Sequence, residues 1–398
     1  MVQPVLIAGG GIGGLTAALA LLRQGRPVRV FEQATQLGEV GAGLQLSANA
    51  TRALHLLGLS QQLAAIAVEP SGKEIRLWNT GQTWKLFDLG ESSIAEYGYP
   101  YYTIYRPDLH RVLVDAIRAL SPDAIQLDAR LESFEQDRSS GCVRVRLADG
   151  TVHEGSALVG ADGVHSAVRS QLFGDGTPHY SGCMAWRGVI PVERIDPAVV
   201  RQVGTNWVGP GRHVIQYPLR AGRLMNFVGI VETDRWMAES WTQRGTHAEC
   251  HADFEGWHPD IHELIRHIET PYRWALMARP PLSSWTQGLV TLLGDASHPT
   301  LPFLAQGAVM AIEDGYVLAR ALSEVGDVAE ALQRYEAARI GRTTAIVEKS
   351  TENGRRFHNP ELASAEGAAA YVDREWSPAR VRERYHWLFD YRVDKISL

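Results

Sequence analysis

His213 and Tyr217 are the residues whose types and spacing best suit acid–base chemistry in this chain. Both lie in the stretch GRHVIQYPLR, where the alternating pattern is typical of a β-strand. Residues four apart on a strand project from one face, so an imidazole and a phenol should share one space. An imidazole with a pKa near 6.5 accepts a proton near neutral pH. The competing interpretation is a structural strand histidine, because most histidines are not catalytic.

A glycine-rich motif near the N-terminus predicts a dinucleotide site. The pattern G-x-G-x-x-G stands at Gly9, Gly11 and Gly14. It directly follows the apolar run Val5–Ala8 and opens a helix with apolar spacing. In such a unit the first glycine makes the tight turn, the second lets the backbone approach a pyrophosphate, and the third lets the helix pack on the sheet. The phosphates would lie on the helix N-terminus, beside Gly13.

The acidic partner of that motif is Glu32, at the end of a second predicted strand, Val28–Phe31. It lies 18 residues after Gly14, close to the spacing of about 20 at which an acid receives a ribose diol. We therefore expect Glu32, with Gln33 beside it, to contact an unphosphorylated ribose. An acid at this position favours FAD or NAD over a nucleotide with a 2′-phosphate.

Three later turns each combine a strand end, a short turn and a helix start. Arg106 joins a strand to a helix that begins with Pro107. Asp162 lies in the turn of GADGVHSAVR, and Asp295 follows Gly294 at the end of an apolar run. Each turn taken alone is compatible with an ordinary strand–helix connection.

The loop after the third turn is stiff and leads into a helix. Its prolines, Pro299 and Pro302, exclude a regular helix, which resumes with Gly307 and Ala308 at its first positions. The first N–H groups of a helix have no partner within the helix and suit an anion. We expect these N–H groups to stabilise negative charge by about 0.3–1 kcal/mol, and by more if buried.

The composition limits the classes of partner. The chain has 398 residues, a net charge of −6 and a pI near 6.2, which argues against nucleic acid or an anionic membrane. Its cysteines, Cys142, Cys183 and Cys250, are odd in number and widely spaced, which suits free thiols in the cytoplasm. The apolar run Val5–Leu22 contains the glycine motif and would make a poor membrane helix.

A histidine-rich stretch invites a metal interpretation that we do not adopt. His258 and His262 stand at i and i+4, the spacing of two ligands on one helix face, and Cys250 is nearby. No second pair has finger-like spacing, and Trp257 with Ile261 indicates an ordinary amphipathic helix. We predict no metal site.

The three turn motifs together resemble the single-component FAD-dependent aromatic hydroxylases. The glycine triplet, the turn Gly160–Gly163 and the pair Gly294–Asp295 match that family in order and spacing, from about Val5 to Leu322. The resemblance implies an α/β, Rossmann-like FAD-binding fold interrupted by a β-sheet substrate domain. Because the chain has a single G-x-G-x-x-G, NADH or NADPH would visit the surface only transiently.

The resemblance also implies roles for the turn residues. Glu32 and Arg106 would contact the ADP part of FAD, and Asp295 would bind the ribityl chain. Asp162 would serve both FAD and the pyridine nucleotide. Gly307 and Ala308 would face the flavin's pyrimidine end, where reduced flavin carries negative charge.

Two stretches are similar to the 3-hydroxybenzoate 6-hydroxylase, salicylate hydroxylase and 6-hydroxynicotinate 3-monooxygenase families: GEVGAGLQLSANA, residues 38–50, and GPGRHVIQYPLRAG, residues 209–222. His213 falls on the proposed base and Tyr217 on a substrate-contacting tyrosine. Gln45 falls where the 6-hydroxynicotinate enzymes carry a histidine. Pro302 stands where the 3-hydroxybenzoate enzymes carry a glutamine, so the substrate and the hydroxylation position stay open.

The implied function is NADH- or NADPH-dependent monooxygenation of a small aromatic acid by O₂, through a flavin C4a-hydroperoxide. That reaction is faster on a phenolate, which His213 would produce. Arg187, Arg212 and Arg220 are conceivable carboxylate partners. The alternatives are a hydroxylase of an N-heteroaromatic acid such as 6-hydroxynicotinate, and a non-catalytic ligand sensor that binds FAD or NAD.

The predicted organisation has three parts. The FAD domain would comprise residues 1–175 and 270–355, interrupted by a β-rich substrate domain at 176–269. A helical and aromatic tail would occupy residues 356–398, and the resemblance favours a homodimer.

Overall fold

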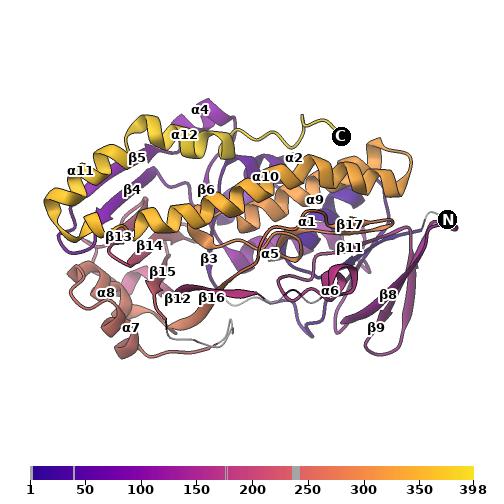
Figure 1. Cartoon of the computed structure of the whole chain (residues 1–398), viewed down its shortest axis with the longest axis horizontal. Helices are drawn as coiled ribbons and strands as arrows, with labels where there is room; N and C mark the ends of the chain where they lie inside the picture. Colours follow the sequence, from indigo (N-terminus) through magenta and orange to yellow (C-terminus); the bar gives the residue numbers. More distant parts are fainter. Residues whose placement is uncertain (1–2, 39–40, 175, 177, 235–242) are drawn as a thin grey trace.

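The computed structural model describes residues 3–38, 41–174, 176, 178–234 and 243–398. Glu39 and Val40, within the stretch at 38–50 noted above, lie outside the described residues, as do a few positions inside the predicted domain ranges. Two large sheets organise the described chain, and the long helix α10 (Val328–Phe357) runs alongside both of them (Figure 1).

The first sheet contains the dinucleotide motif. Its order is β17-β18-β11-β1-β2-β7, and every pair from β18 to β7 is parallel. The central strand β1 is buried on both faces, as expected when helices cover a parallel sheet. The strands are β1 (Val5–Ala8), β2 (Val28–Phe31), β7 (Ile125–Gln126), β11 (Ala157–Gly160), β17 (Thr286–Gln287) and β18 (Val290–Leu292).

Two helices pack closely beside this sheet, α1 (Ile12–Arg23) and α9 (Gly307–Glu324). A side chain at Gly13 would begin 2.5 Å from Leu293, and one at Gly315 would begin 2.7 Å from the backbone nitrogen of Ala17. Glycines therefore allow α9 to lie against α1, which brings its N-terminus next to the glycine motif. The helix α5 (Arg106–Leu120) also contacts α1.

The second sheet has seven strands in the order β16-β12-β15-β14-β13-β4-β5. All its pairs are antiparallel except β13 with β4. Its outer face packs on the helices α7 (His247–Asp253) and α8 (Pro259–His267) through Trp186, Phe227 and Phe254. The strands are β4 (Gly72–Leu77), β5 (Thr83–Asp88), β12 (His179–Pro191), β13 (Gly204–Gly209), β14 (Arg212–Leu219), β15 (Leu224–Glu232) and β16 (Tyr272–Ala278).

The two sheets are connected by a two-stranded ribbon and by the C-terminal helices. The ribbon consists of β3 (Gly43–Leu46) and β6 (Tyr102–Tyr105), and β6 contacts β14 of the seven-stranded sheet. The remaining elements are α2 (Ala48–Leu56), α3 (Ser60–Ile66), α4 (Glu91–Tyr97), β8 (Leu131–Asp137), β9 (Cys142–Leu147), β10 (Val152–Gly155), α6 (Ala167–Phe173), α11 (Ala365–Glu375), α12 (Pro378–Phe389) and the 3₁₀ turns η1 (Val192–Arg194), η2 (Gly294–Ala296), η3 (Pro302–Leu304) and η4 (Pro360–Ala363).

The predicted α/β fold with an inserted β-sheet is confirmed, and both strands of the N-terminal motif have the predicted bounds. We keep the three-part division as a proposal with one addition. The strands β4 and β5, residues 72–88, lie within the range 1–175 but pair with the seven-stranded sheet. The aromatic residues of α12, within the C-terminal tail, pack against β5 and α4 (Figure 1). Within the described ranges, no helix is long and apolar enough to cross a bilayer.

Candidate active site

The glycine turn after β1 is crowded at two positions and open at the third. Gly9 has φ of +107°, and a side chain there would begin 2.3 Å from the carbonyl oxygen of Ala161. A side chain at Gly14 would begin 2.1 Å from the Gly9 carbonyl oxygen. At Gly11, apart from its own helix and chain neighbours, no atom of the described residues lies within 4 Å of the corresponding position. The open side of this turn can therefore receive a ligand against bare backbone.

Glu32 fixes the shape of this turn from the end of β2. Its carboxylate accepts hydrogen bonds from the N–H of Gly10, at 2.7 Å, and from the N–H of Ala34, at 2.8 Å. The His110 ring contacts the Gly10 carbonyl oxygen at 2.8 Å. Gln33 is exposed beside them. The acid is only partly buried, so its remaining lone pairs can accept a ribose hydroxyl.

The central Asp-Gly turn is held by its own aspartate. Asp162 accepts hydrogen bonds from the Ser166 hydroxyl, at 2.5 Å, and from the N–H groups of Ala167 and Val168. Arg169, on the helix that follows, donates to the carbonyl oxygen of Ala296 at 3.1 Å. The Asp162 turn and the Gly294–Ala296 turn are thus tied together.

Asp295 lies in the turn η2, shortly after β18. Its side chain is exposed to solvent, yet protein surrounds it closely enough to raise its pKa by burial. The charges of His298 and Arg106 act in the opposite direction on that pKa. Gly294, with φ of +62°, makes the turn that positions this carboxylate.

The proline loop ends in a strained residue and a helix start. Ala305 has φ of +54°, an uncommon value for a residue with a side chain. Gln306 precedes α9 and donates to the Ser47 hydroxyl at 3.1 Å. Gly307 and Ala308 follow and stay partly exposed, so the N–H groups at this helix N-terminus are accessible.

A buried charge network anchors the same helix. Glu313 and Asp314 on α9 are fully buried, and both pair at 2.7 Å with Arg339 of α10. Arg342 also pairs with Glu313, at 2.8 Å, and His298 pairs with Asp314 at 2.7 Å. This network fixes α9 and the loop before it to α10.

Together these turns fit FAD. The open glycine turn and Glu32 suit the ADP part, because bare backbone and an acid are what a pyrophosphate and a ribose need. The exposed carboxylate of Asp295 suits a polyol chain. The N-terminus of α9 suits the negative edge of a flavin. Among the described residues, no group of three or more His, Cys, Asp and Glu side chains could hold a metal ion.

The inner face of the seven-stranded sheet presents a half-exposed floor. Ile215 on β14 and Val228 on β15 are paired partners in central strands, yet both are partly exposed. Central strands are normally covered, so this exposure marks a hollow over the sheet. His213 and Tyr217 flank Ile215 on the same face, as the alternating pattern predicts.

A polar cluster forms the Tyr217 end of this face. The Tyr101 hydroxyl donates to the side-chain oxygen of Gln45 at 2.9 Å. The Lys73 ammonium lies 5.1 Å from the centre of the Tyr101 ring. Burial lowers the pKa of Lys73 to about 7, although the side chain keeps some solvent contact. Burial raises the pKa of Tyr217 well above its usual value, so this phenol is a hydrogen-bond donor at neutral pH.

Lys73 is the cation of this cluster that lacks a counter-charge. Among the described carboxylates, none forms a salt bridge with it. A side chain at Gly204 would begin 3.4 Å from Lys73 and 3.9 Å from Gln45, so the two groups flank one small space.

The three arginines that the sequence offers as carboxylate partners lie in different places. Arg220 forms a two-point ion pair with Asp108, at 2.7 and 2.9 Å, which links β14 to α5. Arg212 neighbours His213 on β14 and therefore projects from the opposite face. Arg187 is on the inner face beside Val228, over the Trp274 ring, and burial lowers its pKa to about 10.

His213 is fully buried at the other end of the inner face. Its Nδ1 lies 2.6 Å from Nε2 of His358, and its ring contacts Phe303 and Phe357. Its Nε2 has no hydrogen-bond partner among the described residues. Burial, followed by the neighbouring His358, holds the pKa of His213 well below its usual value. At neutral pH the ring is therefore neutral. Pro302, next to Phe303, is exposed.

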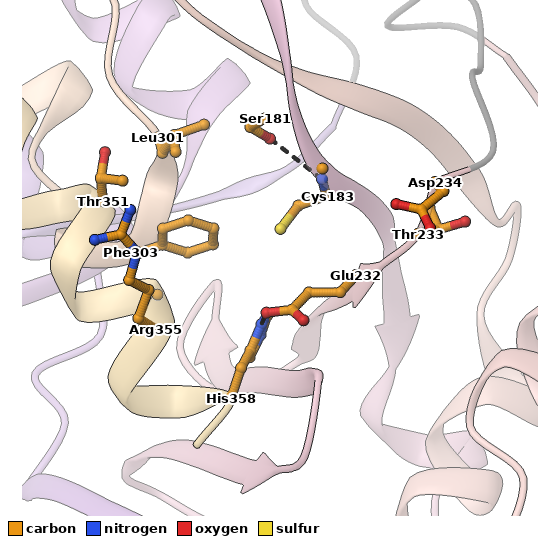
Figure 2. Close-up of a pocket in the computed structure, with 12 residues that line it drawn as sticks. Ser181, Cys183, Glu232, Thr233, Asp234, Leu301, Phe303, Thr351, Arg355 and His358 are labelled. Atoms are coloured by element: carbon orange, nitrogen blue, oxygen red, sulfur yellow. Dashed lines mark hydrogen bonds and ion pairs between the residues drawn. The ribbon is translucent and has the colours of Figure 1, made fainter. Parts of the chain in front are cut away.

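A cavity of about 470 Å³ lies beyond His358 (Figure 2). It is bordered by the ends of β12 and β15, by η3 and by α10, and it is separate from the glycine turn. Glu232 and His358 point toward one another at its edge, with a carboxylate–imidazole distance of 2.7 Å. This cavity does not contain the predicted cofactor residues.

Sequence reasoning missed Lys73, Tyr101, His358 and Glu232. Lys73 and Tyr101 have no motif around them. His358 follows a 30-residue helix and lies 145 positions from its partner His213. Such pairs become visible only when the sheet and α10 are placed together.

Comparisons with known proteins agree with this geometry. Residues 3–350 match the model of the FAD binding domain family. The chain is 39% identical to a 3-amino-4-hydroxybenzoate 2-monooxygenase of Streptomyces platensis, over 99% of this chain and 97% of that protein. It is 37% identical to a 3-hydroxybenzoate 6-hydroxylase of Polaromonas naphthalenivorans, over 98% and 96%.

A solved structure supports the same assignment. Klebsiella pneumoniae HpxO, complexed with FAD and uric acid, matches with a TM-score of 0.84 and 28% identity over 98% of this chain and 96% of that chain. The chain therefore belongs to the FAD binding domain family and is a flavoprotein monooxygenase.

Proposed function

We propose that this enzyme uses NADH or NADPH and O₂ to hydroxylate a small aromatic acid that carries a ring hydroxyl. The main support for this function is the inner face of the seven-stranded sheet. It has a cation and a phenol at one end, a neutral buried imidazole at the other, and an apolar floor between. Relatives named for hydroxylation of hydroxybenzoates and 6-hydroxynicotinate support the substrate class.

The dimensions of this face suit such an acid. His213 and Tyr217 are four residues apart, which corresponds to about 13 Å between their Cα atoms along the strand. An aromatic ring on the floor of Ile215 and Val228 would lie between the two ends. Its carboxylate would face Lys73 and Tyr217, and its hydroxyl would face Nε2 of His213. We propose Gln45 and Pro302 as further contacts at the borders of this space.

Each polar group then has a defined task. Lys73 neutralises the carboxylate, and Tyr217 donates a hydrogen bond to the substrate. His213 is neutral, so its free Nε2 can accept the proton of the ring hydroxyl. The resulting phenolate pushes charge to its ortho and para carbons. Leu301 and Phe303 close the far side of the face and exclude water from the reacting ring.

When bound, FAD would supply electron transfer from the pyridine nucleotide and activation of O₂. The residues that we propose to hold it are Gly9, Gly11, Gly13, Gly14, Glu32, Gln33, Arg106, Asp162, Asp295, Gly307 and Ala308. The chain contributes backbone and charge. The N-terminus of α9 would stabilise negative charge on a reduced flavin. Arg106 directly follows β6 and the Asp162 turn follows β11, and we propose that the pyridine nucleotide approaches from these strand ends.

The test is NADH and NADPH oxidation by purified holoenzyme against 3-hydroxybenzoate, 3-amino-4-hydroxybenzoate, salicylate and 6-hydroxynicotinate, with product analysis. One acid should accelerate oxidation and be recovered hydroxylated. His213→Ala should keep its FAD but yield hydrogen peroxide in place of hydroxylated product. Failure of every acid to stimulate oxidation would contradict the proposal. Light scattering of the same sample tests a homodimer, which we propose from the resemblance.

A further inference from the structure

A chain of hydrogen bonds leads from His213 to solvent. His213 Nδ1 lies 2.6 Å from His358 Nε2, and His358 Nδ1 lies 2.7 Å from the Glu232 carboxylate. Exposure rises along it, from a fully buried His213 to side-chain exposures of 3% at His358 and 54% at Glu232. Figure 2 shows the outer half of this chain at the edge of the 470 Å³ cavity.

The hydrogen-bond directions along this chain are fixed by its outer end. An ionised carboxylate only accepts, so Nδ1 of a neutral His358 must donate to Glu232. Its Nε2 then carries a lone pair, and Nδ1 of His213 must donate to it. The proton of a neutral His213 is thereby placed on Nδ1, which leaves Nε2 as an acceptor. That is the nitrogen without a partner, and the one the proposed substrate hydroxyl would meet.

Burial makes a proton retained on His213 costly. An imidazolium at this position would be a buried cation next to a second imidazole, which disfavours it. Moving the Nδ1 proton outward as Nε2 is protonated avoids that charge. The positive charge then never accumulates in the apolar surroundings of Phe303 and Phe357.

His358 is held in position for this transfer. It directly follows α10, its carbonyl oxygen accepts from the Gly211 N–H at 3.2 Å, and its own N–H donates to the Gly354 carbonyl oxygen. The Glu232 N–H in turn donates to the Gly211 carbonyl oxygen at 2.9 Å. One loop residue therefore anchors both outer members of the chain.

Several charged and titratable groups surround the outer end of this chain. Glu232 ends β15 and Asp234 lies two residues beyond it, whereas Arg355 lies on α10 and Cys183 on β12. Burial raises the pKa of the Cys183 thiol to about 11, so it is neutral near pH 7. Of these groups, only Glu232 is hydrogen-bonded to His358 among the described residues.

We propose that His358 and Glu232 relay the substrate's hydroxyl proton from His213 to the solvent cavity. The inference rests on the proposed role of His213. In the step, the substrate O–H bond breaks and an N–H bond forms at His213 Nε2. The Nδ1 proton of His213 passes to His358 Nε2, and the Nδ1 proton of His358 passes to Glu232 and then to water. No electron is transferred, and the reverse flow resets the chain when the product hydroxyl is reprotonated.

The test follows ionisation of the bound acid in the oxidised holoenzyme, by stopped-flow ultraviolet difference absorbance. The ligand is whichever of 3-hydroxybenzoate, 3-amino-4-hydroxybenzoate and 6-hydroxynicotinate the wild type turns over fastest. His358→Gln and Glu232→Gln should slow phenolate formation, by about 10- to 100-fold for His358→Gln, with dissociation constants unchanged. Asp234→Asn removes the same charge from the same cavity outside the chain and should leave the rate unchanged.

Chemical rescue separates a relay from a merely structural role. In His358→Ala the vacated site opens on the cavity, so added imidazole should restore the rate of phenolate formation. Flavin content and circular dichroism verify folding, and the exposed Glu232→Gln keeps the test decisive if His358 variants misfold.

The variants also distinguish this inference from the proposed function. If His213→Ala still ionises the ligand at the wild-type rate, the proposed function itself fails. If His213→Ala prevents ionisation while Glu232→Gln and His358→Gln ionise at the wild-type rate, the relay alone is overturned.

Discussion

Lys73 offers the most quantitative prediction. Its pKa falls from 10.5 to about 7 because its ammonium is desolvated without a counter-charge. At about 1.4 kcal/mol for each pH unit, keeping this ammonium charged in the ligand-free protein costs about 5 kcal/mol, and above pH 7 the group loses its proton instead. A carboxylate that hydrogen-bonds to this ammonium should recover about 1.5–3 kcal/mol, which raises the pKa of Lys73 to about 8–9.

Binding of a carboxylate should therefore take up a proton. At pH 8 Lys73 is about one-tenth protonated in the free enzyme and at least half protonated in the complex. We expect an uptake of about 0.4–0.8 proton for each bound benzoate, an acid chosen because it has no hydroxyl to ionise. Isothermal titration calorimetry in two buffers of different ionisation enthalpy measures this uptake directly.

Variants define what would refute this reasoning. Lys73→Met should abolish the uptake and weaken benzoate binding by about 10- to 100-fold at pH 6, with a smaller difference at pH 9. Lys85→Met, at an exposed lysine on the neighbouring strand, is the matched control and should bind as the wild type does. Equal affinity of Lys73→Met and wild type at pH 6, or no proton uptake by the wild type, would remove Lys73 from the site.

Substitutions elsewhere test folding, cofactor binding and substrate binding. Gly14→Ala should lower both the thermal midpoint and the FAD content, because the added side chain meets the Gly9 carbonyl oxygen. Gly11→Ala should fold normally and lose only FAD, because the position is open. Calorimetry measures the thermal midpoint, and flavin absorbance measures the FAD content. Arg339→Met should destabilise the protein to urea by about 3–5 kcal/mol, since it strands Glu313 and Asp314 without their buried partner; wild-type stability would contradict the network. Without ligand, Lys73→Met should raise the thermal midpoint at pH 6. Between pH 7 and 10 the lysine binds more protons in the unfolded protein than in the folded one, so the stability of the wild type rises with pH in this range. The difference in thermal midpoint between Lys73→Met and the wild type should therefore narrow from pH 7 to pH 10. Tyr217→Phe should raise the KM for the acid without moving the pH profile of kcat, since this phenol stays protonated.

Local patterns were sufficient to predict the cofactor half of the molecule. Strand, glycine turn, helix and acid follow one another within a short segment, so Gly9 to Glu32 could be predicted almost residue by residue. The shared face of His213 and Tyr217 followed from the two-residue period of a strand.

The substrate half depends on contacts between distant segments. Lys73 is an ordinary lysine in sequence and becomes distinctive only where Gln45 and Tyr101 pack around it. The sequence offers Arg220 as a carboxylate partner, but it does not show that Asp108, on another element, already pairs with it. The same holds for His358, which tertiary packing brings to His213.

The most direct measurement of the central claim is hydroxylation under ¹⁸O₂ with mass analysis of the product. We predict that one atom of oxygen gas enters the aromatic acid for each pyridine nucleotide oxidised. Product oxygen derived from water, or nucleotide oxidation without any labelled product, would show that the face bearing His213 and Lys73 does not perform this reaction.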